Sequence, residues 1–143
     1  MKASIFSFLS LGVLFFALCG FQASTQDAAG KMGQITVKVS FKGIIEGYDH
    51  ACKTQLFVDG KMLGESEVSK ESQGNTFTTK VEKGVHAVRV VNLAEYEGKW
   101  EEHNVANNYT VDVTYEDPLK VKKKHTITLV ADIGSESVKT TVK

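Results

Sequence analysis

The residues best suited to chemistry are His50 and Cys52, which lie two apart in the polar stretch 46–52. On a strand, this spacing places both side chains on one face. Zinc and copper accept imidazole and thiolate ligands, so the pair is a candidate metal site. Two ligands do not complete such a site, and the fold would have to bring in further histidines from His86, His103 and His125. The pair also lacks the orienting group that a cysteine nucleophile needs, so we favour a polar loop with one buried cysteine.

A second candidate surface surrounds the single tryptophan. Glutamates at positions 95, 97, 101 and 102 are close in the sequence to three ring-bearing residues, Tyr96, Trp100 and His103. Paired carboxylates beside an aromatic ring occur in glycoside hydrolases, but a charged, solvated loop is the preferred interpretation. Exposed aromatic faces stack on sugars or anchor a protein partner, whereas a buried tryptophan would be a core anchor. We therefore predict no enzyme activity and treat the three residues as a candidate binding surface.

The N-terminal residues predict export. Residues 3–19 carry no charge, follow Lys2 and are succeeded by small residues. A basic start, an apolar run and small residues are typical of a secretory signal peptide, which we assign to 1–23. Acylation of Cys19, as in a bacterial lipoprotein, is one alternative, although Leu18 is large for the position before it. A retained membrane helix is the other.

The remaining chain is near neutral and forms one domain. Small, polar residues at 24–34 predict a flexible spacer, followed by a single domain at 35–143. The chain has 17 lysines and arginines and 17 aspartates and glutamates, a formal net charge of zero. This balance argues against general nucleic-acid binding, which needs a basic face. The basic run 120–125 either touches an anionic lipid or polyanion or, as we favour, lines the wet edge of a strand.

Period-two alternation predicts strands at 35–42 and 109–115, each with one buried and one wet face. Asp59 and Gly60 between apolar flanks predict a hairpin. Pro118 suits a turn. Further strands are expected at 76–81, 85–93, 96–105, 125–133 and 138–142. Seven to nine short strands favour an antiparallel β-sandwich of immunoglobulin-like or transthyretin-like type, with a small β-barrel as the alternative.

Residues 56–93 carry a further pattern, Leu-Phe-Val-Asp-Gly-Lys from Leu56, then Gly64, then Gly84-Val85-His86 before a valine-rich strand. This stretch resembles the PEGA-type repeat, a small β-rich domain of exported bacterial proteins. The Pro-Glu-Gly-Ala segment of that family is missing, and Val85 separates Gly84 from His86. The resemblance implies an exported sandwich that serves as a binding or structural unit, with no catalytic residues to carry over.

These patterns predict an exported, non-catalytic module of the cell envelope or secreted space that recognises a protein or glycan partner. No cofactor is expected, and the membrane would be reached only through a lipid anchor at Cys19. The alternative is a periplasmic protein that binds a small ligand or, through His50 and Cys52, a metal. The sequence leaves the oligomeric state open, and the compartment is periplasmic, outer-envelope-associated or extracellular.

Overall fold

The computed structural model describes residues 30–143, so the predicted signal peptide at 1–23, Cys19 and most of the spacer lie outside the described residues. The described chain forms ten strands and two short 3-10 helices: β1 (Met32–Lys42), β2 (Ala51–Val58), β3 (Lys61–Glu65), β4 (Ser69–Lys70), η1 (Glu71–Gln73), β5 (Asn75–Glu82), β6 (Gly84–Tyr96), β7 (Lys99–Glu102), η2 (Val105–Asn107), β8 (Thr114–Val121), β9 (Lys124–Asp132) and β10 (Ser137–Val142). No helix in residues 30–143 is long and apolar enough to cross a membrane. The all-β prediction is confirmed.

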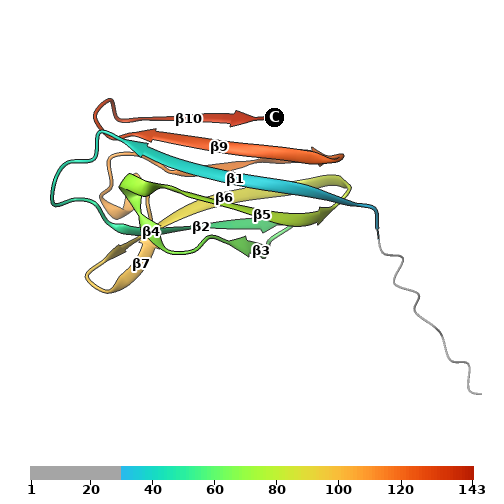
Figure 1. Ribbon diagram of the computed structural model, residues 1–143, viewed down its shortest axis with the longest axis horizontal. Helices are drawn as coiled ribbons and strands as arrows, with labels where there is room; N and C mark the ends of the chain where they lie inside the picture. The colour runs from blue at the N-terminus through green and yellow to red at the C-terminus, as the bar shows by residue number, and fades with distance from the viewer. Residues whose placement is uncertain (1–29) are drawn as a thin grey trace, which may run out of the picture.

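The first sheet has four strands in the order β10-β9-β1-β5 (Figure 1). β1 lies inside this sheet, antiparallel to β5 and parallel to β9. A parallel pair needs a long connection between its strands, and the whole segment from β2 to β8 supplies it. β10 pairs only with β9 and therefore leaves a free edge in the described chain.

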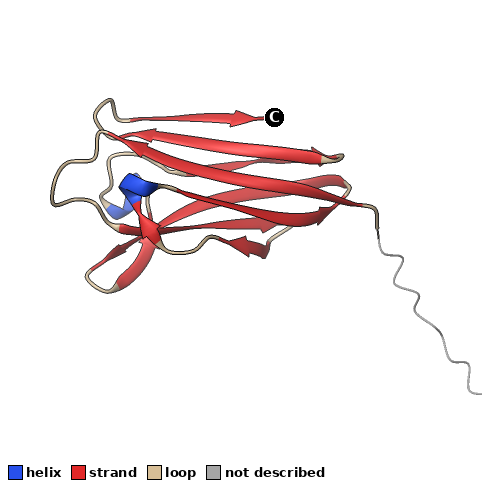
Figure 2. Ribbon diagram, in the orientation of Figure 1, coloured by secondary structure: helices blue, strands red, loops and turns tan. Residues whose placement is uncertain are grey.

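The second sheet is built around the antiparallel pair of β2 and β6. β3 and β4 pair in succession with the far side of β2, and β7 and β8 with the far side of β6. Both sheets are open, and Figure 2 shows them as two layers. This arrangement is that of a β-sandwich and differs from the closed barrel considered as the alternative.

One apolar core fills the space between the sheets. Alternate residues of β1, β2 and β9 point inward. The largest fully buried side chains include Ile35, Val37, Leu56, Ile127 and Leu129. Burial of this surface away from water is the main driving force for the fold. The predicted inward faces of 35–41 and of 127–131 are confirmed.

The connections gather at the two ends of the sandwich. One end carries the β1–β2 loop, η1, the β6–β7 hairpin and the segment 103–113 (Figure 1). The opposite end carries the start of β1 and the β2–β3, β5–β6 and β8–β9 turns. This separation arises because the long strands cross the sandwich and the chain reverses direction at its ends.

The predicted hairpin at Asp59-Gly60 is confirmed, and both residues have positive φ angles of 50° and 78°. The Asp59 carboxylate accepts a hydrogen bond from the Ala87 backbone N–H at 2.9 Å and lies 2.7 Å from His86 Nδ1. The two halves of the 56–93 pattern therefore meet in space. The hydrogen bond to Asp59 raises the pKa of His86, and the bond from His86 lowers the pKa of Asp59.

The strand predicted at 109–115 is wrong in its first part. β8 begins at Thr114, and residues 103–113 form a loop that contains η2. Val111 and Val113 are buried, as their alternation predicts. The alternation arises here without a strand, because the Val113 backbone bonds to His103 and Asn92 and turns the loop inward.

Three smaller predictions also need correction. Pro118 lies within β8, which pairs only with β6, so its missing N–H falls on an open edge where proline is tolerated. Residues 96–105 form the end of β6 and the short β7, joined by a turn at Glu97-Gly98, instead of one strand. β1 begins at Met32, inside the predicted spacer, because Met32 pairs with Glu82.

The pair His86–Asp59 predicts a pH-dependent stability. The raised pKa of His86 adds stability below about pH 6.5 that is lost as pH rises, and the lowered pKa of Asp59 adds stability above about pH 4 that is lost as pH falls. We expect His86→Gln to lower Tm more at about pH 5.5 than at about pH 8.5. Thermal unfolding at both values measures this, and Asp59→Asn is expected to show the same trend. An equal loss at both values would contradict the assignment.

Gly74, which ends η1, predicts a local steric constraint. Its φ is 63°, and a Cβ there would collide with the Val39 carbonyl oxygen of the neighbouring strand. We expect Gly74→Ala to cost about 3 kcal/mol of unfolding free energy in urea denaturation. Gly98→Ala is the matched control, because Gly98 has a φ of 76° but open space around it, and about 1 kcal/mol is expected. Similar costs at both positions would show that backbone conformation alone sets the penalty.

Candidate binding cleft

A cleft of about 680 Å³ opens at the end of the sandwich that carries the β1–β2 loop. Its walls come from that loop, from the β6–β7 hairpin and from the segment 103–113. The ring-bearing side chains that line it are Tyr48, His50, Tyr96, His103 and Tyr109. The cleft is thus formed by segments far apart in the sequence.

The rings in the cleft contact one another in a series. Tyr109 lies against His103, with ring centroids 4.3 Å apart and planes inclined by 31°. The ring of His50 meets Tyr109 edge-on at 5.9 Å and Tyr96 edge-on at 6.2 Å. Such tilted and edge-on contacts are favourable for aromatic rings and hold their orientations.

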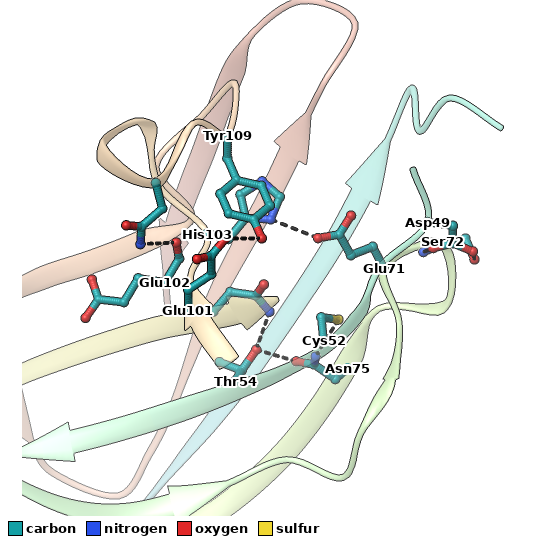
Figure 3. A network of polar contacts seen from close by, with 12 residues as sticks. Asp49, Cys52, Thr54, Glu71, Ser72, Asn75, Glu101, Glu102, His103 and Tyr109 are labelled. Carbon is teal, nitrogen blue, oxygen red and sulfur yellow. Dashed lines mark hydrogen bonds and ion pairs between the residues drawn. The ribbon is translucent and has the colours of Figure 1, made fainter. Parts of the chain in front are cut away.

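Beneath Tyr109, His103 and Glu71 form a buried pair. Each side chain is only 3% exposed, and His103 Nδ1 lies 2.8 Å from Glu71 Oε1 (Figure 3). Phe41 of β1 also packs against the imidazole, with ring centroids 5.3 Å apart. Burial of a carboxylate beside an imidazole is tolerated because each satisfies the other.

Polar contacts hold Glu71 and the β1–β2 loop together. The Glu71 backbone N–H donates to the His50 carbonyl at 3.0 Å. The next residue, Ser72, donates to the Asp49 carboxylate from its backbone N–H at 2.9 Å and from its hydroxyl at 2.7 Å. The Ser72 hydroxyl and backbone bonds lower the pKa of Asp49. The loop is thereby tied to η1 directly below the cleft.

The segment 103–113 is held by its own polar contacts. Asn104 caps η2 by accepting a hydrogen bond from the Asn107 backbone N–H at 3.0 Å. The Tyr109 hydroxyl donates to Glu101 Oε1 at 3.1 Å across the cleft wall. Burial, followed by this contact with Glu101, raises the pKa of Tyr109, so the phenol stays neutral at ordinary pH.

One imidazole nitrogen in the cleft wall has no partner. His103 Nε2 is buried, and no hydrogen bond reaches it from the described residues. Buried polar atoms are nearly always hydrogen-bonded, so an orphan atom beside a cleft is a point where a bound polar group gains affinity. In the tautomer that carries its proton on Nδ1 and donates to Glu71, Nε2 is a hydrogen-bond acceptor.

The structure separates the predicted binding surface into two parts. Tyr96 and His103 both line the cleft. Trp100 is paired with Glu95, one residue from Tyr96, and therefore points to the opposite face of the sheet. There its ring lies 4.9 Å from the Lys53 ammonium and is 39% exposed, so it is neither in the cleft nor a core anchor.

The predicted metal ligands also have different surroundings. His50 lines the cleft, whereas Cys52 is fully buried among Ser69 and Asn75, with Asn75 Nδ2 3.5 Å from its sulfur. Burial raises the pKa of the Cys52 thiol, which disfavours the thiolate that a metal needs. No cluster of three or more potential ligands of the His, Cys, Asp or Glu type occurs within residues 30–143. The acylation candidate Cys19 lies outside these residues.

Sequence reasoning missed Glu71 and Tyr109 as members of the site. Tyr109 was assigned to a strand because it begins an alternating run. Glu71 lies in the polar run 65–73, where nothing distinguishes it from exposed neighbours. Its burial follows only from its contact with His103, 32 residues away in the chain.

Comparison with known proteins leaves the family open. No family model matches the chain, and no curated protein matches it. Similar solved structures include a non-hemolytic pneumolysin from Streptococcus pneumoniae (12% identity, TM-score 0.41, covering 80% of this chain and 24% of that one) and listeriolysin O (13%, 0.38, 80% and 22%). The membrane-binding domain of pneumolysin is 12% identical, with a TM-score of 0.39 and coverage of 79% and 96%. The chain spans about a quarter of the full-length toxins, and a likeness this low carries no functional argument.

The buried pair predicts a large cost when one partner is removed. Glu71→Ala removes the only hydrogen-bond partner that the His103 imidazole has among residues 30–143, and we expect a loss of about 3–5 kcal/mol in urea denaturation. The double variant Glu71→Met with His103→Phe removes both polar groups and is expected to be clearly more stable than the single variant. A double variant less stable than Glu71→Ala would contradict this account.

Proposed function

We propose that this chain is an exported, non-catalytic binding domain whose cleft holds a glycan. The observation that supports this most is the convergence of three tyrosines and two histidines around one cleft of about 680 Å³. Pockets of this size and shape are suited to small ligands, whereas protein partners favour larger and flatter surfaces.

The exposed rings favour a sugar as the ligand. Tyr48 is 67% exposed and Tyr96 is 52% exposed, so both keep apolar ring surface in water at the rim. A pyranose offers a flat face of C–H groups that covers such rings, and its hydroxyls need hydrogen-bond acceptors and donors. Glu101 and Asn107 supply these groups in the same cleft.

A binding role without catalysis agrees with the surroundings of His103. Glu71 orients the imidazole as the acidic member of a catalytic triad would. A hydrolase of that kind also needs a hydroxyl or thiol nucleophile at the other nitrogen, and none of the described residues bonds to Nε2. Cys52, the candidate thiol, bonds instead to Asn75.

Three finer assignments belong to the same proposal. Export rests on the signal-like residues 1–23, with acylation at Cys19 as the route to a lipid anchor. The immunoglobulin-like or transthyretin-like type of sandwich is supported by the two facing sheets of short strands. The partial resemblance of residues 56–93 to the PEGA-type repeat is supported by the contact of Asp59 with His86, which brings its two halves together.

The glycan assignment predicts a selective loss of binding. We expect calorimetric titration with a panel of neutral oligosaccharides to find a ligand, and Tyr48→Ala or Tyr96→Ala to weaken it by about tenfold or more, because each removes ring surface that the sugar covers. Trp100→Ala is the matched control, since Trp100 lies on the same hairpin but on the opposite face.

Equal losses in all three variants would show that the cleft is not the binding site. If no oligosaccharide binds but crosslinking in the native envelope captures one protein through Tyr48 or Tyr96, the partner is a protein. Hydrolysis of an ester or glycoside that is lost in His103→Gln would replace the binding role with an enzyme activity.

A further inference from the structure

The end of the sandwich opposite the cleft is strongly basic. Three segments meet there, residues 30–34, 80–85 and 120–125. They contain one glutamate, Glu82, and the seven lysines Lys31, Lys80, Lys83, Lys120, Lys122, Lys123 and Lys124, all of them exposed. We call these seven residues the basic end. Because the whole chain is neutral, this concentration of positive charge leaves the rest of the molecule net negative.

Backbone pairing brings the lysines together from distant parts of the sequence. The Lys83 N–H donates to the Lys31 carbonyl at 2.9 Å, and the Gln34 N–H donates to the Lys123 carbonyl at 2.7 Å. Gln34 is paired with Lys80 on one side and with Lys124 on the other, which places these two lysines about 10 Å apart on one face. The run at 120–125 therefore comprises the end of β8, a turn at 122–123 and the start of β9, instead of the wet edge of one strand.

None of the seven lysines of the basic end forms an ion pair within residues 30–143. The lysine ion pair in residues 30–143 is that of Lys53 with Glu65, which lies elsewhere. The remaining ion pairs of these residues involve Arg89 or a histidine. At physiological salt the Debye length is about 8 Å, so charges clustered within one end act together on a nearby anionic surface.

The position of the basic end points to a particular kind of anionic surface. The described chain enters the domain here, at the start of β1 (Figure 1). The apolar segment 3–19 precedes it, and the intervening residues 20–31 span at most about 40 Å when extended. A membrane that holds this segment or an acylated Cys19 would lie next to the lysines and away from the cleft.

We propose that the basic end docks on an anionic phospholipid surface and points the aromatic cleft away from the membrane. Each lysine near such a surface adds about a fivefold preference for anionic lipid over neutral lipid. The face is formed by strand ends and turns that carry exposed lysines, which suits contact with a charged surface. This inference does not depend on what the cleft binds.

Vesicle sedimentation with the full chain tests the proposal. The measured quantity is the ratio of binding to phosphatidylcholine vesicles with and without about one-third phosphatidylglycerol, so that the apolar segment 3–19 contributes equally to both. We expect Lys83→Gln, Lys122→Gln and Lys123→Gln together to lower this ratio by roughly 100-fold at low salt. Lys42→Gln, Lys99→Gln and Lys139→Gln together are the control, because they remove the same charge from exposed positions on other strands and are expected to lower it less than threefold.

Equal losses in the two triple variants, or no preference of the native chain for anionic vesicles, would overturn the proposal. Tighter binding to soluble dextran sulfate than to the vesicles would also overturn it, in favour of an anionic polysaccharide. Tyr96→Ala is expected to leave the ratio unchanged, which separates this surface from the cleft. A loss in Tyr96→Ala equal to that of the lysine variant would contradict an independent docking end.

Discussion

The hydrogen bond between Glu71 and His103 is the contact on which the organisation of the cleft end depends. Glu71 sits where the chain passes from the second sheet to the first, and His103 follows the last residue of β7. Both side chains are buried, so neither is satisfied by water. Their contact fixes η1 against the segment 103–113. The rings of Phe41 and Tyr109 both pack against the imidazole of His103.

Around this pair, the loops at the cleft end are connected to one another and not only to the sheets. Asp49 bonds to Ser72, the Glu71 backbone bonds to His50, and Tyr109 bonds to Glu101. A loop held by such contacts positions its side chains more rigidly than a loop that only connects two strands. The aromatic rings of the cleft therefore form a preorganised surface, which lowers the entropy that a ligand must overcome.

The two ends of the sandwich differ in the kinds of side chain that they carry. Aromatic residues and several carboxylates gather at the cleft end, while seven lysines gather at the other. The topology is responsible, because alternating strand directions send successive connections to opposite ends. The two proposed surfaces therefore belong to opposite ends of one rigid core, and each can engage its own partner without blocking the other.

Prediction from sequence succeeded where a local pattern has one physical meaning. The alternation at 35–41 identified β1 and its buried face, and Asp59-Gly60 identified a hairpin, because these features involve only neighbouring residues. The alternation at 109–115 misled, since Val111 and Val113 are buried by a loop that folds inward. The turn predicted at Pro118 is wrong, because an edge strand such as β8 tolerates a proline, and whether a strand is an edge strand depends on the sheet.

The residues of the candidate site were likewise predictable from the sequence only in part. Tyr96, His103 and His50 were identified as reactive or binding side chains by their residue types alone. Only the tertiary structure decided that these three share a cleft, that Trp100 faces the other way, and that Glu71 is the partner of His103. Residue type and local alternation are properties of short segments, so they are enough to predict an all-β chain and most of its inward faces. Pairing between distant segments depends on which strands become neighbours, and that is settled only when the two sheets close on a common core.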